Sequence, residues 1–288
     1  MISVIVCSVR PERLASVSKN IADTIGVPYE LVSIDNRAAQ LGICAAYNRG
    51  ADQARFDILC FVHEDVEFID RGWGARVLTH FENDPFLGLV GLAGSRYKAC
   101  VPSGWFNDSP DDICLNVWHP SGTGTKQMLQ RPKQFECETT IPVVALDGVW
   151  LCARRSVWHQ IQFNEELTGF HFYDVDFSLR VAEKHSVAVV YDVALLHYSY
   201  GSFNAAWVLA ALEYVNHSLR KLPAFVAPPN SVDEKERVAV RYWLRFLRKK
   251  GLPLRLRLRW LSASRCWAYP SEWRLALRFL ICSGSGRQ

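Results

Sequence analysis

An alternation of strand and helix patterns in the first 62 residues most constrains how this chain can fold. Short apolar runs, typical of strands covered on both faces, alternate with segments whose apolar residues recur at helical spacing. Pro11 suits the first turn of the first helix, where its missing amide would have no partner anyway. We therefore expect strands at 2–9, 29–35 and 57–62, and helices at 11–25 and 43–55. This order predicts an α/β fold with a doubly wound, mostly parallel sheet, the arrangement used to bind nucleotides.

Polar side chains lie at the carboxyl ends of all three predicted strands. Ser8 and Arg10 lie at the end of the first, Asp35 ends the second, and Glu64 and Asp65 follow the third. The carboxyl ends of parallel strands meet at one sheet edge, where open α/β sheets bind their ligands. Acids there can hold a divalent cation, which in turn holds a diphosphate, although a solvated turn after the strand accounts for the same residues. No glycine-rich dinucleotide loop or Walker loop follows the first strand, so we expect bound phosphates to depend on a metal.

Two later segments add polar residues at strand ends. Residues 143–155 have the pattern of a strand, a polar kink at Asp147 and Gly148, and a strand resumed. His197 ends another apolar run, where a lone histidine is equally well understood as a structural residue.

The segment 169–180 is an aromatic loop that leads into a predicted helix carrying Asp174 and Asp176. Either carboxylate can cap the helix N-terminus, and for Asp176 we prefer this capping role. Aromatic neighbours would exclude water from Asp174 and raise its pKa toward the range that suits a general base.

In their order and spacing these motifs resemble the inverting family 2 glycosyltransferases, which have the glycosyltransferase-A (GT-A) fold. The shared order is a first strand, a second strand ending in Asp35, a helix carrying Ala-Ala-Tyr-Asn-Arg-Gly at 45–50, and a strand ending in the acidic triplet. The nearest resemblance is to the small streptomycin-biosynthesis-type branch, which has a similar His-acid-Asp-Val sequence in place of D-x-D. The likeness runs from residue 1 to about 222 and is strongest at 43–68 and 143–202.

This resemblance implies a metal-dependent, inverting transfer of a hexosyl or N-acetylhexosaminyl group. The donor would be a nucleotide-diphosphate sugar, with UDP as the commonest choice, and the acceptor a hydroxyl of a glycan or lipid-linked sugar in cell-envelope polysaccharide biosynthesis. The implied cofactor is Mn²⁺ or Mg²⁺. Inversion is a single displacement, so one carboxylate suffices to take the acceptor proton.

The resemblance and the strand ends together assign the site residues. Asp174 is the expected base, and Asp65 and His197 are the expected metal ligands. His63 stands where the family has the first acid of its triplet, and Tyr173 replaces an acid before the base. The expected donor contacts are Ser8, Arg10, Asp35, Asn48, Glu64, Asp65, Asp147 and Gly148.

The C-terminal part differs from the rest in charge. Residues 235–288 contain 14 Lys and Arg against two Glu, whereas the first 234 residues have a net charge of −8. We expect a catalytic domain at 1–222, a linker at 223–234 and a basic amphipathic region at 235–288. Trp243, Trp260, Trp267 and Trp273 lie among these basic residues, a pattern that suits an anionic membrane surface.

The C-terminal region also fits roles that involve no membrane. Its helices can pack on the body of the protein or on a second copy, which leaves a homodimer open, whereas nucleic acid fits poorly because the body is acidic. Residues 254–259 alternate with period two, which suggests an edge strand or a segment at an interface. Residues 98–140 have the composition of a long loop over an acceptor site.

Nine cysteines without a C-x-x-C pair predict reduced thiols, and no apolar run is long enough for a signal peptide or a membrane span. We therefore expect a cytoplasmic protein, peripheral on the inner face of the membrane. Two alternative functions remain: a nucleotidyltransferase, for which only Arg10 offers a basic residue in the first loop, and a non-catalytic sugar- or membrane-binding protein with a degenerate transferase body.

Overall fold

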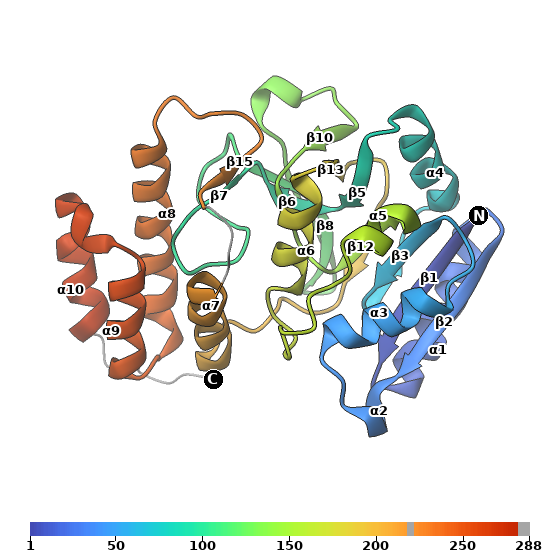
Figure 1. Ribbon diagram of the computed structural model, residues 1–288, viewed down its shortest axis with the longest axis horizontal. Helices are drawn as coiled ribbons and strands as arrows, with labels where there is room; N and C mark the ends of the chain where they lie inside the picture. Colours follow the sequence, from blue (N-terminus) through green and yellow to red (C-terminus); the bar gives the residue numbers. More distant parts are fainter. Residues whose placement is uncertain (218–221, 282–288) are drawn as a thin grey trace.

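The computed structural model describes residues 1–217 and 222–281 as three sheets with helices around them (Figure 1). The central seven-stranded sheet has the order β10-β13-β5-β12-β3-β1-β2. Its strands are β10 (Thr140–Pro142), β13 (Ser186–Val190), β5 (Leu87–Gly91), β12 (Trp150–Arg154), β3 (Ile58–Val62), β1 (Ile2–Ser8) and β2 (Tyr29–Asp35). The predicted α/β fold is confirmed, and the sheet is mixed because β12 runs antiparallel between β3 and β5.

Helices cover both faces of this sheet because its strand side chains alternate between two cores. Val4 and Val6 of β1 face a core with α1 (Pro11–Thr24) and α4 (Trp73–Asn83). Ile5 of the same strand faces a core with the second set of helices. This set comprises α3 (Ile43–Gln53), α5 (Arg155–Gln160) and α6 (Tyr173–Ala182). A short helix, α2 (Asn36–Ala39), follows β2.

A second sheet brings the later polar strand ends to the end of β3. It has the order β11-β6-β8-β14-β4, with β9 paired to β8. Its strands are β11 (Ala145–Leu146), β6 (Ala93–Ser95), β8 (Ile113–Ser121), β14 (Leu195–His197), β4 (Val66–Phe68) and β9 (Gly124–Gln130). Because β14 pairs antiparallel with β4, His197 lies opposite Val66, directly after the acidic triplet.

The C-terminal helices pack on the body of the protein. They are α7 (Ala205–His217), α8 (Val232–Leu247), α9 (Leu254–Ala263) and α10 (Trp273–Ile281), and with β7 (Tyr97–Lys98) and β15 (Ala224–Phe225) they surround a third core. The indole N–H of Trp243 donates to Phe106 O at 3.1 Å, and that of Trp260 donates to Pro102 O at 2.9 Å. Figure 1 shows α8, α9 and α10 at the end of the molecule opposite β1 and β2, with α7 between them and the sheet. The expectation that Trp243 and Trp260 face a membrane is therefore wrong, because both are buried.

Three further sequence-based expectations need correction. Residues 254–259 form the first turns of α9 rather than an edge strand or an interface segment, since Leu256 and Trp260 pack inward at helical spacing. The segment 98–140 contains the β8–β9 hairpin rather than one long loop. Cys60 and Cys152 are register partners on β3 and β12 and form a disulfide, so these two are not reduced thiols. Register is a tertiary property that composition does not reveal.

Among the described residues, no helix combines the length and the apolar character that crossing a membrane requires. The boundary expected at 223–234 stays a prediction.

Candidate active site

The acidic triplet is anchored at its middle residue. Both Ser8 Oγ, at 2.7 Å, and the amide of Arg10, at 3.2 Å, donate to Glu64 Oε2, as does the amide of Val9. Glu64 thereby ties the turn between β1 and α1 to the end of β3. The structure thus brings Ser8, Arg10 and Glu64 together, as predicted from their strand ends, and their contact with a donor remains a prediction.

His63, Asp65 and His197 form a cluster of three metal-ligand types. Their candidate ligand atoms all lie within 4.8 Å of one another. His197 Nε2 is 3.5 Å from Asp65 Oδ1, and His63 Nδ1 is 4.0 Å from the same oxygen. Two imidazoles and one carboxylate suit a divalent cation such as Mn²⁺, so these residues fit the metal that the sequence predicts. His63, absent from the predicted ligands, joins them because β4, which follows residues 63–65, pairs with β14 and brings His197 to this turn.

Tyr173 fixes the orientation of His63. Its hydroxyl donates to Gly148 O at 2.9 Å and lies 2.8 Å from His63 Nε2. A phenol has only one proton to donate. Because the Tyr173 hydroxyl donates it to Gly148 O, the hydroxyl oxygen accepts the hydrogen bond from His63 Nε2–H. The neutral imidazole then has its lone pair on Nδ1, the nitrogen nearer Asp65. Partners of this kind orient metal-binding histidines in general.

Gly148 is required by this contact. A Cβ built on Gly148 would lie 2.0 Å from the Tyr173 hydroxyl oxygen, so any other residue displaces the tyrosine. The amide of Gly148 also donates to Asp174 Oδ2 at 2.9 Å. The backbone at one glycine therefore joins the histidine cluster to the candidate base.

Asp174 opens α6 and is held by backbone amides. Its Oδ1 accepts from the amide of Val175 at 2.9 Å, while Oδ2 accepts from Gly148. Burial and then the nearby charge of Asp147 raise the pKa of Asp174 to about 7. Asp147 itself accepts from Trp105 Nε1 at 2.9 Å and from the amide of Val149. A carboxyl with such a pKa is half ionised near neutral pH, as a general base should be.

In the histidine cluster the pKa of the carboxyl is lowered, whereas the pKa of Asp174 is raised. Burial alone would raise the pKa of Asp65, but the hydrogen bond from His197 and then the charge of that imidazole outweigh it and hold that pKa well below its ordinary value. Burial and the neighbouring His197 lower the pKa of His63. Asp65 is therefore ionised and His63 favours its neutral form, which are the forms that ligate metals.

Two predicted donor contacts are engaged elsewhere. Asn48 lies in α3, where its side chain bonds Phe163 and Glu165 and accepts from Trp158 Nε1 at 3.1 Å. It thus holds the loop before α6 in place. Asp35 caps α2 and pairs with Arg37, whose guanidinium lowers the pKa of Asp35 to about 2. No contact joins either residue to the histidine cluster within the described part of the chain.

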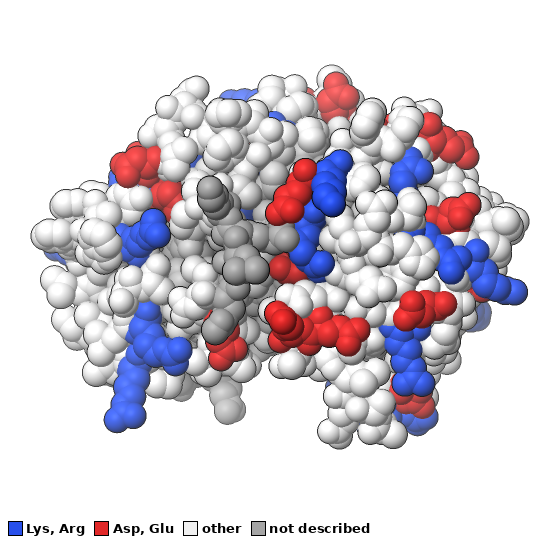
Figure 2. Space-filling model, viewed as in Figure 1, with Lys and Arg blue, Asp and Glu red and all other residues white. Residues whose placement is uncertain are grey.

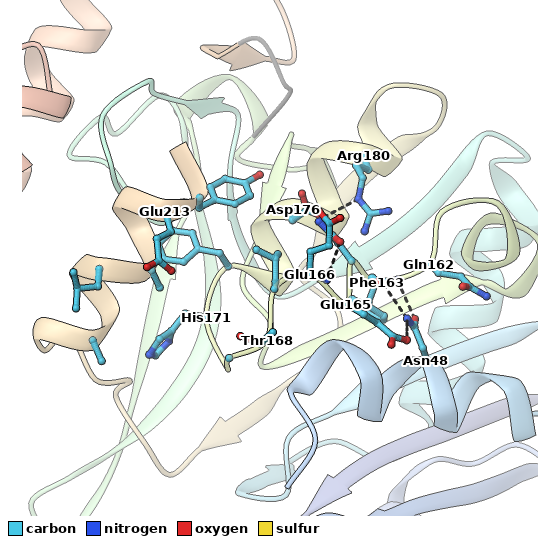
Figure 3. A pocket seen from close by; sticks show the side chains of 18 of the residues that line it. Asn48, Gln162, Phe163, Glu165, Glu166, Thr168, His171, Asp176, Arg180 and Glu213 are labelled. Atoms are coloured by element: carbon cyan, nitrogen blue, oxygen red, sulfur yellow. Dashed lines mark hydrogen bonds and ion pairs between the residues drawn. The ribbon is translucent and has the colours of Figure 1, made fainter. Parts of the chain in front are cut away.

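Asp176 lies in a separate environment from Asp174. Its Oδ2 accepts from Arg180 Nε at 2.7 Å, one turn along α6. Both side chains line a cavity of about 1370 Å³, which Figure 3 shows between α6, α7 and the loop that includes Glu165 and Glu166. Asp176 therefore pairs within α6, whose N-cap is Phe172 without a side-chain hydrogen bond, so the predicted capping role of Asp176 is wrong.

Three contacts were not predicted from the sequence: Tyr173 with His63, Trp105 with Asp147, and His119 with His197. Tyr173 attracted attention only as a departure from the family pattern, although a tyrosine next to the base is itself a signal of a polar partner. Trp105 and His119 lie in the segment expected to be a loop. His119 Nδ1 is 3.0 Å from His197 O, and its ring stacks on Tyr200 at 4.6 Å.

The sequence matches the glycosyltransferase-like family over residues 3–221, so the chain belongs to this family. No protein of curated function matches the sequence significantly. The fold is similar to that of S. aureus TarS residues 1–349, with a TM-score of 0.52, 15% identity, and coverage of 95% of this chain and 82% of that one.

Two further solved structures are similar. The mannosyltransferase PcManGT from Pyrobaculum calidifontis, solved with GDP-Man and Mn²⁺, has a TM-score of 0.50 at 13% identity and coverage of 100% and 76%. GalNAc-T7, solved with UDP, GalNAc and Mn²⁺, has a TM-score of 0.51 at 11% identity and coverage of 99% and 55%. The fold is thus of the GT-A type; at these identities the likeness extends to the fold alone.

Proposed function

We propose that this chain is a metal-dependent inverting glycosyltransferase of the streptomycin-biosynthesis-type branch. It moves a hexosyl or N-acetylhexosaminyl group from a nucleotide-diphosphate donor, a UDP-sugar in first place, to a hydroxyl acceptor. One observation carries the proposal: the hydrogen-bonded path from His63 through Tyr173 and Gly148 to Asp174. It joins candidate metal ligands to a carboxyl whose pKa is raised to about 7. The nucleotide sugars and Mn²⁺ bound by the similar structures support the same class of reaction.

Asp174 takes the proton of the acceptor hydroxyl. Each of its oxygens accepts one backbone N–H and keeps a second lone pair for that proton. The same two amides hold the carboxylate in one orientation while the acceptor oxygen attacks the anomeric carbon. Asp147 keeps the proton affinity of Asp174 high, which strengthens the base.

His63, Asp65 and His197 would hold Mn²⁺ or Mg²⁺, which supplies positive charge to the departing nucleoside diphosphate. Tyr173 keeps His63 in the tautomer that presents Nδ1 toward Asp65. Glu64 fixes the turn between β1 and α1 through Ser8 and the amide of Arg10, and so shapes the side of the site expected to take the nucleotide.

The acceptor in this proposal is a glycan or a lipid-linked sugar presented at the inner face of a membrane, in cell-envelope polysaccharide synthesis. Donor contacts from Asp35, Asn48, Asp147 and Gly148 belong to the proposal as well. Among these, Asp147 and Gly148 lie beside the base, whereas Asn48 would act through the loop that it holds.

The test is an incubation of the protein with a panel of nucleotide sugars and MnCl₂, followed by product analysis. Release of nucleoside diphosphate that depends on metal and on Asp174 supports the proposal. Release of pyrophosphate would assign a nucleotidyltransferase instead. Donor binding without release of either product, in the presence of glycan and lipid-linked acceptors, would assign a non-catalytic binding protein.

A further inference from the structure

Helix α10 exposes an apolar stripe beside a basic one. Trp273, Leu277 and Ile281 recur every four residues and are 52%, 60% and 77% exposed. Arg274 and Arg278 lie on the adjacent stripe and are exposed too. The opposite side of the helix holds Phe279 in the third core, so α10 is anchored while the two stripes face outward.

A basic groove runs between α10 and α8. Its volume is about 470 Å³, and the lining residues include five Lys and Arg that have no carboxylate partner in the described part of the chain. These five are Arg245, Arg248, Lys249, Arg274 and Arg278. The one acid in the groove, Glu272, is buried and already paired with Arg241 at 2.9 Å.

The two features form one surface. Trp273 Nε1 donates to Trp267 O at 3.2 Å, which adds a second exposed tryptophan, 67% accessible, next to the apolar stripe. Basic side chains protrude at the lower left of Figure 2, over the end of the molecule where Figure 1 places α8–α10. Arginines that gather phosphates and aromatic rings that enter the headgroup region are the two elements of interfacial membrane binding.

We propose that α10 and the α8–α10 groove form the membrane-binding face of this protein. The groove takes the phosphates of anionic phospholipids, and Trp267, Trp273 and Leu277 enter the lipid interface. Charge complementarity selects the bilayer as the occupant, since a protein partner for the apolar stripe alone would not require five unpaired cations. Trp243 and Trp260 have no part in this contact because they are buried in the third core. Binding at this face is independent of the glycosyl transfer, so it can be tested without enzymatic activity.

The test is co-sedimentation of the full chain with vesicles of phosphatidylcholine alone or with 30 mol % phosphatidylserine. We expect binding to the anionic vesicles at low salt that weakens as salt rises. Arg274→Glu with Arg278→Glu should weaken it at least ~20-fold, since each basic residue near such a surface contributes roughly fivefold. Trp273→Ala with Leu277→Ala should weaken binding by several-fold, both to the anionic vesicles and to phosphatidylcholine alone.

Matched controls separate this face from general charge and hydrophobicity. Lys19→Glu with Lys126→Glu makes the same charge change on α1 and β9 and should leave binding as it is. Phe86→Ala with Met128→Ala removes exposed apolar side chains from the body, 74% and 44% accessible, and should also have no effect. Thermal unfolding of each variant checks that the fold is retained.

Three results would overturn the inference. The first is a wild-type chain that stays in solution with anionic vesicles at low salt. Unchanged sedimentation of the Arg274→Glu, Arg278→Glu protein would assign binding to another face. Loss of sedimentation in inorganic phosphate, but not in chloride of equal ionic strength, would assign the groove to a soluble phosphate instead of a bilayer.

Discussion

The two ends of the candidate site contain the same chemical group in opposite states. Asp65 lies beside two imidazoles and has a lowered pKa, whereas Asp174 lies beside Asp147 and has a pKa raised to about 7. Burial raises the pKa of both carboxyls, but at Asp65 the hydrogen bond from His197 outweighs it, whereas at Asp174 the charge of Asp147 adds to it. In the proposed function, Asp65 is the anion that would hold the metal and Asp174 is the base that titrates near neutral pH.

The largest effect is expected at the base. Asp174→Asn keeps the size and the helix-capping ability of the side chain but cannot accept the acceptor proton, so kcat should fall by roughly 10²–10⁴. Nucleotide-sugar affinity should stay close to that of the wild type. Steady-state kinetics and calorimetry measure the two quantities. Asp176→Asn is the matched control on the same helix, and inactivity of that variant in place of Asp174→Asn would move the base to the ion-paired carboxylate.

The next largest effect is expected at Asp65, the carboxyl of the histidine cluster. Asp65→Ala removes the oxygen that lies nearest both imidazoles, so metal-dependent binding of the nucleoside diphosphate should weaken by roughly 100-fold or more. Calorimetric titration with UDP in the presence of Mn²⁺ and of EDTA isolates the metal-dependent part. Equal binding by the variant and the wild type in Mn²⁺ would remove the histidine cluster from the site.

Tyr173 should show an intermediate effect because it acts through its neighbours. Tyr173→Phe keeps the ring packed against Tyr47 and Phe163 but leaves His63 free to change tautomer, so Mn²⁺ affinity should fall by roughly 10-fold. Gly148→Ala displaces the same hydroxyl by steric contact and should reproduce the loss. A loss of stability with unchanged Mn²⁺ affinity in both variants would reduce Tyr173 to a packing residue.

The smallest effect is a shift of the pH profile. Asp174 must be ionised to act, and its pKa is raised to about 7, so kcat/KM should fall about tenfold per pH unit below that value and level off above it. Asp147→Asn removes a negative charge that raises this pKa, so the acidic limb should move to lower pH. An unshifted limb in Asp147→Asn would mean that burial alone sets the pKa of Asp174.

Much of the site framework could be predicted from the sequence because strand ends carry positional meaning. The predicted strand at 29–35 has the bounds of β2, and Ser8, Glu64, Asp65 and His197 meet at one place. Apolar periodicity fixes which strands are buried, and a parallel β-α-β order then fixes which ends meet.

The remaining features depend on contacts between distant segments, which periodicity does not encode. The period-two pattern at 254–259 suggested a strand, but the third core offers a helical surface and residues 254–263 form α9. Asn48 matched a family motif, yet its partners come from residues 158–165, far along the chain. Tyr173 looked like a departure until the fold placed His63 and Gly148 on either side of its hydroxyl.

The most direct test of the central claim measures donor binding by calorimetry and turnover by kinetics for Asp65→Ala and Asp174→Asn. Both measurements use Mn²⁺ and one nucleotide sugar that the wild-type protein turns over. We expect Asp65→Ala to lose metal-dependent donor binding, and Asp174→Asn to bind the donor like the wild type and lose turnover. The reverse pattern, with donor binding lost in Asp174→Asn and kept in Asp65→Ala, would contradict the division of the site into a metal end and a base end.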